Sequence, residues 1–153
     1  ICKWHATLCY VQGRDNIIGG TIAVAASSAA GSDFIPPKPE LLNELLNELF
    51  KWYEINKDNL NPALIACIMS FRFVTIHPFY DGNGRMSRLL MNYILFKNSY
   101  PMFNITYKIR KSYYSALQKS QVAFGFKRDE TLFSAWFFKN YIKMYEENLK
   151  RKK

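Results

Sequence analysis

The sequence has few cysteines and no long hydrophobic run, and each shortage excludes a class of protein. Its three cysteines, Cys2, Cys9 and Cys67, are odd in number and share no metal-ligand spacing. That pattern favours free thiols in a reducing, cytoplasmic compartment over a disulfide framework. No run approaches the roughly 18 apolar residues of a membrane span, and no signal-peptide layout is visible. These features argue against a disulfide-stabilised secreted module and against a membrane span within residues 1–153, and no partner in a membrane is expected.

The composition that is present fits one well-packed domain. The chain has 153 residues, of which 49% are hydrophobic and 16% aromatic, and it contains no internal repeat or interdomain linker. We therefore expect a single domain over residues 1–153. Because the first residue is Ile1, we expect this domain to be truncated at its N-terminus. The net charge of +9 suits a domain that attracts nucleic acid, ATP or an acidic partner.

One stretch, Ile76 to Arg88, concentrates the chemically active residues. Gly82 and Gly84 allow backbone conformations and close approaches that a side chain would block, and Asn83 between them tolerates the left-handed region. A helix begins at or just inside this turn, because its apolar face repeats at helical spacing. That face consists of Met86, Leu89, Leu90, Tyr93 and Ile94. The N–H groups of a first helical turn lack internal partners, so the turn is suited to hold an oxyanion or a phosphate.

Charged and titratable side chains surround this turn. Arg85 and Arg88 are three residues apart, on one side of the expected helix, and a guanidinium suits phosphate oxygens. Asp81 would repel a phosphate unless a cation lay between them, and Mg²⁺ is commonly held by one carboxylate and substrate phosphates. His77, fixed by Pro78, has its unperturbed pKa near neutrality and is the candidate general base.

The stretch resembles the Fic-domain signature His-Pro-Phe-x-(Asp/Glu)-Gly-Asn-(Gly/Lys)-Arg, in which Tyr80 takes the free position and Arg88 is the second arginine. The resemblance implies an all-α Fic fold, a bundle of about six to eight helices with a small β-hairpin flap beside the active-site loop 77–85. It also implies a protein adenylyltransferase, which moves AMP from ATP to a Ser, Thr or Tyr hydroxyl of a target protein and releases pyrophosphate.

Residue by residue, the resemblance implies that His77 is the general base, Phe79 anchors the loop in the core and Asp81 binds Mg²⁺. The rest of the motif would hold the phosphates of ATP. Gly82, Asn83 and Gly84 would contact the α- and β-phosphates, and Arg85 and Arg88 would contact the β- and γ-phosphates. A related branch that transfers phosphate carries alanine and lysine in the turn, and the two glycines argue against that branch.

Two further regions are assigned by the same resemblance. Residues 17–37 would form the flap, where Phe34 and Ile35 dock an extended target segment by β-augmentation. Composition alone would make this segment a surface loop. Tyr113 and Tyr114 would contribute to the adenine pocket, although we expect one of the two rings to fill core instead.

The remaining helices follow from apolar periodicity. We expect helices from Pro39 onward, over 63–75, from the turn to about residue 98, over 110–121 and over 131–149. Asn61 should cap the second of these, whose apolar residues surround it almost completely. That helix should be central and should aim His77, while Arg72 within it should be snorkelling or ion-paired.

Regulation and alternative functions stay open at this point. Many Fic enzymes are inhibited by a glutamate from a (Ser/Thr)-x-x-x-Glu-(Gly/Asn) helix, and no Ser or Thr here has Glu four residues later. We favour an inhibitory helix upstream of Ile1. The alternatives are a helix supplied by an antitoxin-like partner, or no inhibitory helix at all. A homodimer also remains an open alternative. The motif also fits removal of AMP or another phosphate-containing donor. A non-catalytic nucleotide- or nucleic-acid-binding module is disfavoured by His77 together with Asp81.

Overall fold

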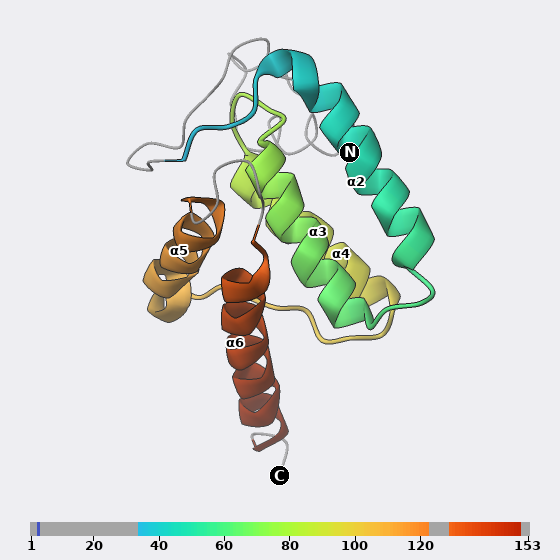
Figure 1. Cartoon of the computed structure of the whole chain (residues 1–153). Helices are drawn as coiled ribbons and strands as arrows, with labels where there is room; N and C mark the ends of the chain where they lie inside the picture. Colours follow the sequence, from blue (N-terminus) through green and yellow to red (C-terminus); the bar gives the residue numbers. More distant parts are fainter. Residues whose placement is uncertain (1–2, 4–33, 123–128, 151–153) are drawn as a thin grey trace.

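The computed structural model describes residues 3, 34–122 and 129–150, and over them the chain is helical without a strand. A short 3-10 helix, η1, leads into five α-helices (Figure 1). Their bounds are η1 Pro39–Leu41, α2 Leu42–Asn56, α3 Pro62–Ile76, α4 Asn83–Lys97, α5 Tyr107–Val122 and α6 Thr131–Lys150. The all-α prediction is confirmed, whereas residues 17–33 of the predicted flap lie outside the described residues.

Helix α3 is the centre of the packing, as its sequence predicted. The Oδ1 atom of Asn61 accepts a hydrogen bond from the Ala63 N–H at 2.9 Å, and Pro62 occupies the first turn. Most residues of α3 are buried, and the helix packs against α4, α2 and α6 (Figure 1). Because α3 packs against three helices, its C-terminal end is held in place, and so is the backbone of His77, which follows it.

Helix α5 begins three residues earlier than the pattern indicated, at Tyr107 instead of residue 110. Tyr107 is 90% exposed, and within the first turn only Ile109 packs against the core. The apolar repeat therefore did not mark the first residues of α5, although their backbone is already helical.

Helices α5 and α6 join the core through aromatic rings. Phe133 stacks on Phe71 of α3 with ring centroids 5.2 Å apart, and Trp136 and Tyr113 lie 5.9 and 6.0 Å from the same Phe133 ring. Offset and edge contacts at these separations are favourable for aromatic pairs. The α5–α6 pair is thereby fixed against α3, which carries the residues leading to the predicted site.

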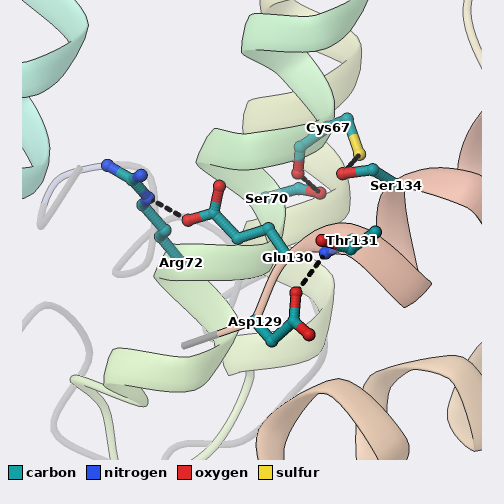
Figure 2. A network of polar contacts seen from close by, with 7 residues as sticks. All are labelled: Cys67, Ser70, Arg72, Asp129, Glu130, Thr131 and Ser134. Carbon is teal, nitrogen blue, oxygen red and sulfur yellow. Dashed lines mark hydrogen bonds and ion pairs between the residues drawn. The ribbon is translucent and has the colours of Figure 1, made fainter. Parts of the chain in front are cut away.

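Polar contacts fix the start of α6 on α3 (Figure 2). The guanidinium of Arg72 pairs with Glu130, and it also lies over the Trp52 ring of α2, 4.5 Å from the ring centre. The prediction that Arg72 is ion-paired is thus confirmed. Nearby, the Cys67 thiol donates to the Ser134 hydroxyl at 3.6 Å, and burial raises the pKa of that thiol to about 12.

Cys67 is a free cysteine, as expected, while Cys2 and Cys9 lie outside the described residues. Among the helices that the structure describes, none combines the length and hydrophobicity that crossing a bilayer requires.

Candidate active site

His77 takes its position from a left-handed turn at the end of α3. Its backbone has φ 54° and ψ 52°, and its N–H donates to the Phe73 carbonyl at 3.1 Å. The ring atom Nδ1 lies 3.3 Å from the Val74 carbonyl oxygen. Because a carbonyl oxygen only accepts, this contact favours the tautomer with the proton on Nδ1 and the lone pair on Nε2.

The electrostatic environment keeps this imidazole neutral. Burial lowers the pKa of His77 below its usual 6.5, and the hydrogen bond to the Val74 carbonyl opposes that change only in part. At pH 7 the ring is therefore a proton acceptor and not a cation. A neutral imidazole with Nε2 unprotonated is the form that a general base requires.

The loop after His77 is held by an amide bracket. Asn83 accepts from the Phe79 N–H through Oδ1 at 2.9 Å and donates to the Phe79 carbonyl through Nδ2 at 2.6 Å. Asn83 is 2% exposed and Phe79 is fully buried, with its ring 6.2 Å from that of Phe73. The bracket therefore closes the loop over the first turn of α4 and seats the Phe79 ring in the core.

The turn itself requires glycine. Gly82 has φ 82°, where a Cβ atom is strained, and its carbonyl accepts from the Met86 N–H at 2.9 Å. Helix α4 begins at the next residue, Asn83, so its first N–H groups lie directly after the turn. At Gly84 an added Cβ would lie 3.3 Å from Nη1 of Arg88, which places that guanidinium beside the same turn.

Asp81 and Arg85 form an ion pair across this turn. Oδ2 of Asp81 lies 3.0 Å from the Arg85 guanidinium, and Oδ1 accepts from the Gly82 N–H at 2.6 Å. In the part of the chain that the structure describes, no group of three His, Cys, Asp or Glu could form a metal site by itself. One carboxylate such as that of Asp81, together with a phosphate chain, is a common donor set for Mg²⁺.

Tyr113 and Tyr114 of α5 differ in how far they are buried. Tyr113 is 3% exposed and Tyr114 is 48% exposed, so the expectation that one ring fills core is met by Tyr113. The Arg110 guanidinium lies 5.7 Å from the centre of the Tyr114 ring. Of the predicted flap residues, Ile35 is 84% exposed and Phe34 is half-buried, and both lie before the first described helix.

Sequence reasoning missed one link between the ends of two helices. The side-chain amide of Gln121, at the end of α5, donates to the Thr75 hydroxyl at 3.1 Å, two residues before His77. Thr75 is a buried polar residue near the end of a largely apolar helix, and the need of its hydroxyl for a hydrogen-bond partner was the available signal.

The family model named Fic/DOC family matches residues 1–95, which is more than half of the chain and includes the whole motif. The chain belongs to the Fic/DOC family.

Curated relatives of this Fic domain are named protein adenylyltransferase Fic. One from Nematostella vectensis is 41% identical over 91 residues, covering 58% of this chain and 21% of the relative. One from Aedes aegypti is 41% identical over 85 residues, covering 55% and 17%. A probable protein adenylyltransferase from Aquifex aeolicus is 34% identical over 91 residues, covering 60% and 28%. The matched part of the chain thus spans 17% to 28% of the length of these relatives.

Solved structures show the same fold as this Fic domain. A Fic domain containing signaling protein from Bacteroides thetaiotaomicron superposes with a TM-score of 0.72 at 28% identity, covering 83% of this chain and 53% of that one. Fic-1 from C. elegans superposes with a TM-score of 0.77 at 24% identity, covering 99% and 43%, and at that identity it shows the fold alone. The predicted Fic fold is confirmed.

Proposed function

We propose that this domain transfers AMP from ATP to a Ser, Thr or Tyr hydroxyl of a target protein and releases pyrophosphate. The observation that carries the proposal is one arrangement: a neutral His77 whose Nδ1 faces the Val74 carbonyl, followed by a glycine turn at the start of α4. Arg85 and Arg88 lie in the first two turns of that helix, at the end where a phosphate chain would bind. The names of the relatives support the same activity.

The proposed reaction has two coupled steps, proton transfer to His77 and displacement at phosphorus. Nε2 of His77 accepts the proton of the target hydroxyl while its oxygen forms a bond to the α-phosphorus of ATP. The bond from that phosphorus to the bridging oxygen breaks, and pyrophosphate leaves with the electron pair. General-base assistance of this kind is typically worth about 10²- to 10⁴-fold in rate. Gly82, Asn83 and Gly84 would present backbone N–H groups to the phosphates, and the two arginines would offset their charge.

Asp81 and Arg85 would exchange partners when ATP binds. Their ion pair is partly exposed, so its separation carries a small electrostatic cost. Arg85 would then contact the phosphates, and Asp81 would be the protein ligand of the ion. A Mg²⁺ ion bound there would neutralise phosphate charge.

Tyr114 would line the adenine pocket, because 48% of the residue is exposed and its ring lies 5.2 Å from that of Tyr113. Phe34 and Ile35 would dock an extended target segment. Residues 1–153 would form one domain of a cytoplasmic protein, with Phe79 as the anchor of loop 77–85. An inhibitory glutamate, from upstream sequence or a partner, would pair with Arg88.

The position of the label on ATP tests the proposal. The chain is incubated with Mg²⁺, lysate proteins as candidate targets, and ATP labelled with ³²P at either the α- or the γ-phosphate. AMP transfer predicts covalent protein label from α-labelled ATP that requires this chain, and no γ-derived label beyond that of the lysate alone, whose kinases transfer the γ-phosphate. Additional γ-derived label that requires this chain would show phosphate transfer instead, and would overturn the proposal.

A further inference from the structure

Helix α6 has two apolar faces, and only one of them packs on the core. The packed face carries the buried rings of Phe133, Phe137 and Tyr141. About 120° further round the helix lies a second face, the outer stripe, which consists of Ala135, Phe138, Ile142, Tyr145 and Leu149. Ile142 is 53%, Tyr145 44% and Leu149 48% exposed, so the part of the stripe toward the C-terminus lies at the surface.

The spacing of the outer stripe is that of a contact between two helices. From Ala135 to Leu149 its residues follow one another at intervals of three, four, three and four. This alternation keeps the side chains in line along a neighbouring helix, as the first and fourth positions of a heptad do. A surface helix that needed only its core contacts would have polar residues on its other faces. The occupant that fits the stripe is therefore another helix.

The C-terminal half of α6 leaves room for a second helix. This half extends beyond the other described helices (Figure 1). Tyr141 is the last buried residue of α6, and residues 145–150 are all exposed. A helix laid along this half can therefore contact the outer stripe without displacing another described helix.

Two charged residues beside the stripe indicate which helix that is. Lys139 and Glu146 flank the stripe on the same side, two turns and about 10 Å apart along the axis, which is too far for them to pair with each other. Among the described residues, neither has an ion-pair partner. A two-fold axis across α6 would bring this flank against the same flank of an antiparallel copy, so that each lysine would face the glutamate of the other chain. The charges are therefore self-complementary.

We propose that the outer stripe of α6 binds the same stripe of a second copy of this chain, in an antiparallel pair of helices. When Ile142 lies level with Tyr145 of the second copy, Phe138 lies level with Leu149, so apolar residues meet in every layer. In this register Lys139 lies about 3 Å along the axis from Glu146 of the second copy, within reach of its long side chain. Because the contact uses the protruding half of each α6, the two domains lie at opposite ends of the helix pair.

Sedimentation equilibrium of the 153-residue chain tests the proposal. We expect the average mass to rise from that of one chain toward that of two between about 1 µM and 1 mM, since an interface of this size is small. Ile142→Ser should weaken this association at least about tenfold, because the change acts on both copies. The matched control is Phe96→Ser on α4, which removes a side chain of a 70% exposed residue outside the stripe and should have no effect.

An exchange of charges tests the antiparallel pairing itself. Lys139→Glu and Glu146→Lys should each weaken the dimer, because each places like charges opposite one another, and the double variant should restore the wild-type affinity. Single variants that associate as the wild type does, or a double variant weaker than both, would overturn the antiparallel pair. A wild-type chain that stays monomeric over the whole range, or equal weakening by Ile142→Ser and Phe96→Ser, would overturn the interface and assign the stripe to another partner.

Discussion

Replacing Asn83 with alanine should lower the free energy of unfolding by about 2–4 kcal/mol. The substitution removes both hydrogen bonds to the Phe79 backbone, at 2.9 and 2.6 Å, in a place where Asn83 is 2% exposed. Each bond contributes about 0.5–1.5 kcal/mol, and each buried group left unpaired costs about 1–3 kcal/mol. The better helix propensity of alanine returns at most about 0.7 kcal/mol. Urea unfolding followed by tryptophan fluorescence measures the loss.

The chain contains a matched control for this substitution. Asn92, also on α4, accepts from the Phe103 N–H at 2.7 Å and donates to the Phe103 carbonyl at 3.1 Å. Asn92→Ala therefore removes the same pair of bonds from a second buried phenylalanine and should cost a similar amount of stability.

The two variants should differ in function. Only Asn83→Ala releases the loop that follows His77, so only this variant should lose ATP affinity, measured by titration at a temperature where both variants are folded. An Asn83→Ala variant as stable as the wild type would refute the claim that the two hydrogen bonds between Asn83 and the Phe79 backbone stabilise the fold. Equal loss of ATP affinity in both variants would show that the effect is one of general stability.

Three further predictions concern the base, the turn and the core. Because burial lowers the pKa of His77, the neutral form persists below pH 6.5, so the transfer rate should stay level from pH 8 to 6.5 and fall only at lower pH; a decline centred above pH 6.5 would contradict this. Gly84→Ala should displace the Arg88 guanidinium, which lies 3.3 Å from the added Cβ, and weaken ATP binding about 3- to 10-fold with AMP binding retained; equal weakening of both would disprove it. Arg72→Ala should lower the free energy of unfolding by about 1–3 kcal/mol, and by less when Glu130→Gln is already present; full additivity in urea unfolding would argue against the ion pair.

The fold was largely predictable because its helices carry clear local signals. The Asn61 cap and the nearly complete apolar surface of α3 each depend on neighbouring residues in the sequence, and both were read correctly. The start of α5 was missed, because Tyr107 is 90% exposed and contributes to no apolar face. An apolar repeat in the sequence marks the buried face of a helix, so it does not mark helical residues that are exposed.

The site was predictable only as far as local spacing reaches. The glycine turn and the start of α4 follow from thirteen consecutive residues. The hydrogen bond from Gln121 to Thr75 joins residues 46 positions apart in the numbering. Such a contact depends on where α5, which packs on α6, lies relative to α3, and no local pattern specifies that.

The central claim, that His77 is the base for AMP transfer, is tested most directly with His77→Asn. Asparagine tolerates the left-handed backbone that His77 adopts, with φ 54°, and it cannot act as a base near pH 7. Wild type and variant are incubated with α-³²P-labelled ATP and Mg²⁺, after titration shows that both bind ATP. The account predicts covalent protein label with the wild type and a loss of at least about 100-fold with the variant. Equal labelling by both proteins would contradict it.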